Sequence, residues 1–109
     1  MSEAVLSQLA ATIRARKADS AAKSYTRQLL EGGPERCARK LGEEAIETVI
    51  AAISQDDAAL KAEAADLIYH LLVLLESRNI GLDDVLKILE GRSGVSGLDE
   101  KASRAAKGA

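Results

Sequence analysis

The sequence predicts an all-α fold, and its composition and hydrophobic periodicity both support this prediction. The 109-residue chain contains a single proline and is rich in Ala, Leu, Glu, Lys and Arg, which favour helices. Apolar residues recur three and four positions apart, and no stretch shows the alternation of a β-strand. A domain of this size buries only roughly two-thirds of its unfolded surface. We therefore expect a bundle of about four main helices that pairing with a second subunit would help to complete.

The N-terminal third predicts one long helix and one short one. Apolar residues fall at helical spacing over residues 2–17, with polar residues on the opposite side. The short-chained, polar stretch 18–25 breaks that helix. Residues 26–31 form at most a short helical turn, because Gly32 and Gly33 stop it.

Two long helices are predicted in the middle of the chain, over residues 34–54 and 57–78. Pro34 opens the first, since a proline's fixed φ and missing N–H do no harm at a helix start. Asp56 is a candidate N-cap for the second. After Asp66 the second helix is apolar almost all round its axis, which predicts burial inside a monomer core or a dimer.

A fourth helix follows the stop signal Asn79-Ile80-Gly81 and covers residues 83–91. Beyond it, residues 92–109 lack apolar periodicity and have a modest basic excess, so we expect a flexible basic tail. We interpret residues 1–109 as a single domain.

The charge balance and the single cysteine argue against several classes of protein. With 15 basic and 17 acidic residues, the net charge of −2 does not suit a general nucleic-acid binder. No apolar run is long enough to span a membrane, and the N-terminus lacks the pattern of a signal peptide. Cys37 has no partner for an intramolecular disulfide, and we interpret it as a small helix residue. These features predict a cytoplasmic protein that binds neither nucleic acid nor membranes.

Five acidic residues form the most informative pattern. Glu43, Glu44 and Glu47 share a sector about 100° wide on the first long helix. Glu63 and Asp66, three positions apart, face one direction on the next helix. If the two helices pack antiparallel, Glu47 and Glu63 come to similar heights. Asp66 opens the segment that is apolar all round, so we expect its carboxylate to be partly desolvated.

Carboxylates that converge in this way repel one another unless a cation holds them. Oxygen ligands suit a hard divalent ion, Mg²⁺ above all, or Mn²⁺. One histidine and one cysteine cannot make a structural zinc site, and a di-iron bundle needs Glu-x-x-His on each of two helices. The sole histidine, His70, lies on the face of Asp66, either beside the metal ligands, against the substrate or as a hydrogen-bonded core residue. The alternative interpretation of the five acids is an ordinary solvated face.

At this point the sequence resembles the phosphoribosyl-ATP pyrophosphohydrolase family. The resemblance covers about residues 24–104 and depends on four motifs: Ser24-Tyr25-Thr26, Lys-Leu-Gly-Glu-Glu-Ala-Ile-Glu at 40–47, Glu-Ala-Ala-Asp-Leu-Ile-Tyr-His at 63–70, and the tail at 92–104. The acidic motifs are shared with the wider MazG-like superfamily. The Ser-Tyr-Thr element, the Asp-Leu-Ile-Tyr-His run and the tail are more particular to this family.

The resemblance implies the second step of histidine biosynthesis, the hydrolysis of phosphoribosyl-ATP to phosphoribosyl-AMP and pyrophosphate. It further implies a cytoplasmic, Mg²⁺-dependent enzyme with a MazG-like all-α fold, a homodimer or a higher oligomer whose subunits build the core together, without a fused cyclohydrolase domain. We expect water to attack a phosphoryl group with the assistance of the metal.

Residue roles follow from the motifs and the resemblance together. We expect four metal ligands: Glu44, Glu47, Glu63 and Asp66. Glu43 is either a further ligand or the base that accepts a proton from water, so the candidate catalytic residues are Glu43, Glu44 and Glu47. We expect polar and basic residues to contact the substrate: Ser24, Tyr25, Thr26, Lys40, His70, Arg92, Lys101 and Arg104. Lys40 could instead pair with Glu44, one turn away.

Two other functions share some of these features. A MazG-like house-cleaning enzyme that cleaves other nucleoside triphosphates would share the acids but need not carry the tail signature. A non-enzymatic helical dimerisation module would carry them as a solvated face and would show no response to Mg²⁺.

Overall fold

The computed structural model describes residues 2–20, 24–92, 101 and 104, and every regular element among them is helical. The elements are five α-helices and one 3₁₀ helix: α1 (Ser2–Ala15), η1 (Arg16–Ala18), α2 (Tyr25–Glu31), α3 (Gly33–Ser54), α4 (Asp57–Ser77) and α5 (Leu82–Gly91). The predicted all-α fold is confirmed, and α2 is the short helical turn expected before the glycine pair. The predicted flexible tail lies mostly outside the described residues.

The helix ends are set by the residues that the sequence singled out. The Asp56 carboxylate caps α4 by accepting a hydrogen bond from the backbone N–H of Ala59 at 2.9 Å. The predicted cap of α4 is therefore confirmed. Gly33 has φ = +77° at the corner between α2 and α3, a conformation that favours glycine. Asn79 has φ = 58° just after α4, where a left-handed residue ends the helix.

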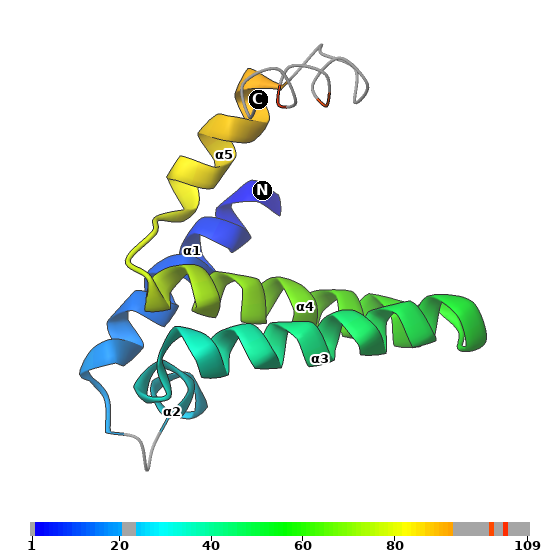
Figure 1. The fold of residues 1–109 in the computed structure, drawn as a ribbon, viewed down its shortest axis with the longest axis horizontal. Coiled ribbons are helices and arrows are strands. Elements are labelled where there is room, and N and C mark those ends of the chain that lie inside the picture. Colours follow the sequence, from blue (N-terminus) through cyan, green and yellow to red (C-terminus); the bar gives the residue numbers. More distant parts are fainter. Residues whose placement is uncertain (1, 21–23, 93–100, 102–103, 105–109) are drawn as a thin grey trace.

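Helices α3 and α4 form a long antiparallel hairpin, against which α1 and α2 lie at one end (Figure 1). The buried core gathers at that end, where α1 and α2 meet the hairpin, and contains Ile13, Leu29, Cys37, Leu72 and Val73. The Cys37 thiol is buried and donates a hydrogen bond to the backbone carbonyl of Leu29 at 3.3 Å. Burial raises the pKa of this thiol, which fits the predicted packing role.

A buried carboxylate connects α1 to the end of α4. Glu76 is only 6% exposed, and its Oε1 lies 2.9 Å from Nε of Arg14 and 3.7 Å from Nζ of Lys17. Lys17 also donates to the side-chain oxygen of Asn79 at 3.0 Å. These pairs stabilise the position of α1 because an unpaired charge at this depth would be costly.

The single chain is open rather than a closed bundle. Its radius of gyration is 16.2 Å, against roughly 13 Å for a compact domain of this length. Helix α5 leads away from the hairpin. In the described part of the chain, no helix is long and apolar enough to cross a membrane. Of the two settings expected for the apolar segment after Asp66, burial inside a monomer core is wrong, because Ile68 and Leu71 are exposed on a side that no described element covers.

Candidate functional site

The hairpin brings acidic side chains from both helices to one place. Glu44 on α3 and Glu63 and Asp66 on α4 each offer a carboxylate oxygen within 4.8 Å of the others. The antiparallel register that produces this convergence is the one expected from the short connection at Asp56. The convergence itself was therefore predictable from helical spacing.

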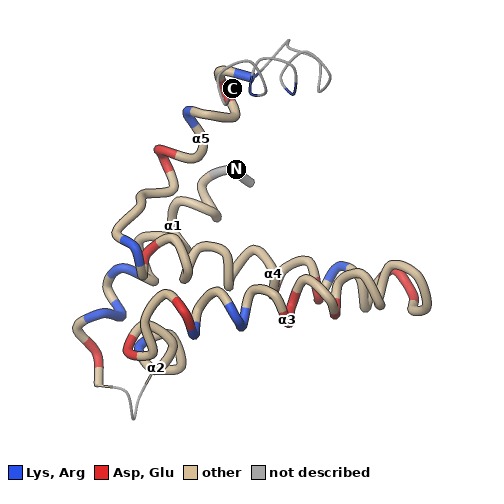
Figure 2. The backbone as a smooth tube through the Cα atoms, viewed as in Figure 1, with Lys and Arg blue, Asp and Glu red and all other residues tan. Residues whose placement is uncertain are grey.

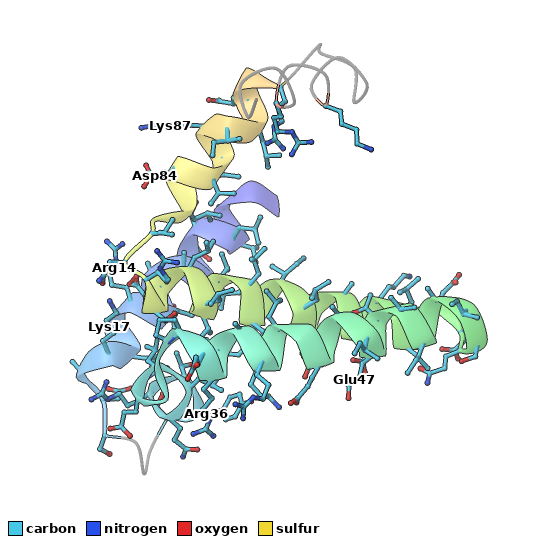
Figure 3. All side chains as sticks on the ribbon, viewed as in Figure 1. Arg14, Lys17, Arg36, Glu47, Asp84 and Lys87 are labelled. Carbon is cyan, nitrogen blue, oxygen red and sulfur yellow. The ribbon has the colours of Figure 1, made fainter. Side chains whose placement is uncertain are left out.

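Glu47 extends this group, whereas Glu43 has a different partner. Glu47 lies close enough to Glu44 and Glu63 for its carboxyl group to raise the pKa of both, but it is not one of the three acids whose oxygens lie within 4.8 Å of one another. Figure 3 labels Glu47 on the middle of α3, where its side chain is exposed. Glu43 instead accepts a hydrogen bond from Nζ of Lys40 at 3.1 Å. Lys40 therefore pairs with Glu43 and not with Glu44, the partner that the sequence offered as an alternative to phosphate.

Two of these carboxylates carry an oxygen that is buried without a partner. Both atoms, Oε2 of Glu44 and Oε2 of Glu63, lack any hydrogen-bond donor. Desolvation, followed by the neighbouring Glu47 carboxyl and the charge of Asp66, raises the pKa of both groups. Buried acceptors without a donor are rare in folded proteins. A set of hard oxygen atoms in this state suits a divalent cation such as Mg²⁺.

Asp66 differs from the expectation in one respect. Its carboxylate converges with the others, but its side chain is exposed and not partly desolvated. The prediction assumed that the apolar segment beginning at Asp66 would be covered on all sides. In the protomer that segment is buried only toward α1, α2 and α3, so Asp66 stays open to solvent.

A threonine lies between the two helices beside the acids. The hydroxyl of Thr48 is 2.8 Å from the backbone carbonyl of Glu44 and 3.3 Å from that of Glu63. Sequence reasoning missed this residue, although its position four residues after Glu44 offered a signal. A threonine hydroxyl inside a helix commonly bonds to the carbonyl four positions earlier, but its contact with α4 could not be read from spacing.

His70 borders the acids and is held by two hydrogen bonds. It is 6% exposed, and Nδ1 lies 2.8 Å from the backbone carbonyl of Asp66. Because a carbonyl only accepts, Nδ1 carries the proton in the neutral ring. Nε2 is then free to accept from the Tyr25 hydroxyl, which lies 3.4 Å away. His70 is therefore a hydrogen-bonded histidine beside the acids. This combines two of the roles left open by the sequence, a place beside the proposed ligands and that of a hydrogen-bonded core residue.

The Ser-Tyr-Thr element supports this histidine from α2. Ser24 Oγ accepts from the backbone N–H of Arg27 at 3.1 Å and caps the helix. The hydroxyl groups of Thr26 and Tyr69 are hydrogen-bonded to each other, and the rings of Tyr25, Tyr69 and His70 pack together. Ser24 and Thr26 are buried and Tyr25 is exposed. Tyr69 was not singled out from the sequence, although it lies beside His70 in the same motif.

The basic residues predicted to contact the substrate are divided between two regions. Figure 2 shows Lys and Arg interleaved with Asp and Glu along the first half of α3, where Lys40 lies one turn before the acids. Arg92, Lys101 and Arg104 are exposed. Arg92 directly follows α5, which leads away from the hairpin, and Lys101 and Arg104 come later in the chain.

Comparison with known proteins gives a consistent result over most of the chain. A family model described as phosphoribosyl-ATP pyrophosphohydrolase matches residues 6–93. The phosphoribosyl-ATP pyrophosphatase of Dinoroseobacter shibae is 54% identical over 100 residues, which are 92% of this chain and 98% of that protein. Phosphoribosyl-ATP pyrophosphatase 1 of Bradyrhizobium diazoefficiens is 58% identical over 96 residues, 88% of this chain and 91% of the relative. The resemblance drawn from the sequence motifs is confirmed.

The raised carboxyl pKa values predict how stability changes with pH in the metal-free protein. The folded state holds protons on Glu44 and Glu63 that the unfolded chain releases above about pH 4.5, the ordinary value for such groups. Their contribution to stability is thus fully present below that pH and is lost as the pH rises through the folded pKa values. Thermal unfolding of Glu44→Gln in a chelator should show a gain over wild type that grows from about pH 4 to pH 8.

Glu35→Gln is the control, because Glu35 is an exposed acid on the first turn of the same helix. Its unfolding curve should follow that of the wild type across the range. If the melting temperatures of Glu44→Gln and wild type differed by the same amount at every pH, the assignment of repulsion between carboxylates at this site would be contradicted.

Proposed function

The chain belongs to the phosphoribosyl-ATP pyrophosphohydrolase family, and from this premise we propose that it hydrolyses phosphoribosyl-ATP to phosphoribosyl-AMP and pyrophosphate. The single observation that supports the site most directly is the pair of buried, unpartnered oxygens of Glu44 and Glu63 on facing helices. Within the family, a house-cleaning activity on other nucleotides or a non-enzymatic role has no comparable support.

The donor set fits Mg²⁺, with Glu44, Glu47, Glu63 and Asp66 as the residues that would hold it. All four are carboxylates, and Mg²⁺ prefers oxygen ligands. Their close approach is unfavourable for the protein alone, which favours cation binding. When bound, the ion would supply positive charge against the phosphate oxygens and the leaving pyrophosphate.

Glu43 is the glutamate best placed to act as a base, because it lies on α3 beside the proposed ligands but pairs with Lys40. We propose that Lys40 moves its ammonium group from Glu43 to a substrate phosphate. Glu43 would then be released to accept a proton from the attacking water. Both residues are at least partly accessible, so this exchange needs no rearrangement of the helix.

The remaining substrate contacts divide into direct and supporting ones. Tyr25 is exposed and offers its hydroxyl beside the acids, so we propose that it contacts the nucleotide, whereas His70 is buried with both ring nitrogens hydrogen-bonded and would hold the Tyr25 hydroxyl in place. Ser24 and Thr26 are buried and already hydrogen-bonded, which favours a role in holding Tyr25 and His70 in place. Arg92, Lys101 and Arg104 would provide the positive charge that an anionic substrate needs.

We also propose that the active form is a homodimer. Four aliphatic residues on one side of α3 are exposed in the protomer, and two more are exposed on α4: Ile46, Val49, Ile50, Ile53, Ile68 and Leu71. Ile53 is 80% exposed, although it belongs to the apolar stripe of its helix. So many exposed aliphatic side chains on the two helices of the hairpin are typical of a surface that another subunit covers.

Removing one proposed ligand tests the active site. Asp66→Asn and Glu47→Gln should each reduce Mg²⁺-dependent pyrophosphate release from phosphoribosyl-ATP by at least about 100-fold, because a ligand charge is lost. Helical content, measured by circular dichroism, should stay near wild type. Asp57→Asn is the control, since Asp57 is an exposed acid on the first turn of α4. Retained Mg²⁺-dependent turnover in both variants would refute the assignment.

Loss of the C-terminal basic residues should affect substrate binding more than folding. A chain ending at Gly91 should show a KM for phosphoribosyl-ATP raised by about tenfold or more, since each charge-assisted contact contributes about 1.5 kcal/mol. The melting temperature should change little. Lys87→Ala, which removes an exposed cation from α5, is the control and should keep the wild-type KM. Unchanged kinetics in the shortened chain would show that the tail takes no part.

A charge on the exposed apolar face of α3 should separate the subunits. Ile53→Asp places an unpaired carboxylate in the proposed interface, so the dimer should weaken by about 100-fold, equivalent to about 3 kcal/mol. Light scattering after size exclusion should then give half the wild-type mass at micromolar concentration. Gln55→Asp adds the same charge at an exposed polar position and should remain dimeric. An unchanged mass for Ile53→Asp would contradict this interface.

A further inference from the structure

We propose that Thr48 is a positioning residue of the metal site, whose hydroxyl sets the distance between the backbones of Glu44 and Glu63. The inference rests on the proposed metal site and extends it to a side chain that carries no charge. It is supported by one juxtaposition: the two residues whose carbonyls meet the Thr48 hydroxyl are the two that carry buried, unpartnered carboxylate oxygens.

The geometry places one hydroxyl between two helices. Thr48 Oγ1 lies 2.8 Å from the Glu44 carbonyl on its own helix and 3.3 Å from the Glu63 carbonyl on α4. A hydroxyl has a single proton, so the two carbonyls share it. Since Thr48 is half-buried and β-branched, its side-chain rotamer is restricted. The shared proton therefore connects two backbones at a defined separation.

This connection acts where the carboxylates oppose close packing. Glu44, Glu63 and Asp66 each offer a carboxylate oxygen within 4.8 Å of the others, so like charges meet at this level of the hairpin. The Thr48 hydroxyl contacts both backbones and so holds the Glu44 and Glu63 side chains at a separation that one cation can span. Groups that orient metal ligands without touching the metal typically change its affinity by 10- to 100-fold when removed.

The Thr48 hydroxyl is not required as a hydrogen-bond donor for the Glu44 and Glu63 carbonyls. Glu44 and Glu63 lie inside α3 and α4, where each carbonyl accepts a hydrogen bond from the N–H four residues later. Ser54 provides a matched comparison on the same helix, because its hydroxyl donates to the Ile50 carbonyl at 2.8 Å. Ser54 makes the bond within its own helix but has no hydrogen bond to α4 in the described structure.

The experiment compares Thr48→Val, Thr48→Ser and Ser54→Ala with the wild type. Valine keeps the shape of threonine without the hydroxyl, and serine keeps the hydroxyl without the methyl group. The readout is the Mg²⁺ concentration that gives half-maximal thermal stabilisation, with kcat and KM measured at saturating Mg²⁺. We expect Thr48→Val to raise that concentration by about tenfold, and Thr48→Ser and Ser54→Ala to stay within about twofold of wild type.

The outcomes distinguish this inference from the function on which it rests. A wild-type Mg²⁺ response in Thr48→Val would overturn the inference alone, as would an equal loss in Thr48→Ser, which would assign the effect to the methyl group. Loss of helical content in Thr48→Val would also overturn it, because the hydroxyl would then hold the fold and not the ligands. Absence of any Mg²⁺ response in the wild type would overturn the proposed metal site and the inference together.

Discussion

The structure depends on the contact between α3 and α4, which places like charges face to face across an antiparallel hairpin. The turn capped by Asp56 sets the register, and that register brings Glu44, Glu63 and Asp66 within 4.8 Å of one another. The hydrophobic core at the open end of the hairpin must offset this electrostatic repulsion, because bringing the carboxylates together is itself unfavourable. A cation would convert this unfavourable cluster into the most strongly held part of the hairpin.

The distribution of burial explains why the protomer can hold such a site yet remain open. Its buried core lies where α1 and α2 meet the hairpin, whereas the aliphatic residues farther along α3 are exposed. On α3 these residues fall next to the sector that carries the acids. A subunit that covers the apolar side would therefore also limit the movement of the acidic side. The proposed dimerisation and the proposed metal binding would then stabilise the same length of hairpin.

Most of the fold and part of the site followed from periodicity and from capping residues. Asp56 and Asn79 mark boundaries because their chemistry is local, and the convergence of Glu44 with Glu63 follows from two helices joined by a short turn. The exposure of Asp66 did not follow, since it depends on which faces of α4 other elements cover. The link from Thr48 to α4 was equally out of reach, because periodicity gives the face of a helix but not the atoms that meet across it.

The polar groups around the acids matter because the acids themselves would repel an anionic substrate. Phosphoribosyl-ATP is a polyanion, so a site lined with carboxylates needs neighbours that bind phosphate or sugar without adding negative charge. His70 donates to the Asp66 carbonyl through Nδ1 and faces the Tyr25 hydroxyl through Nε2, so the two side chains are hydrogen-bonded to each other beside the acids. Burial raises the pKa of Tyr69 and so keeps its phenol protonated beside Thr26. The groups that border the acids from α2 and from His70 and Tyr69 on α4 are thus hydrogen-bonding, whereas the carboxylates of α3 and α4 are the proposed ligands for a cation.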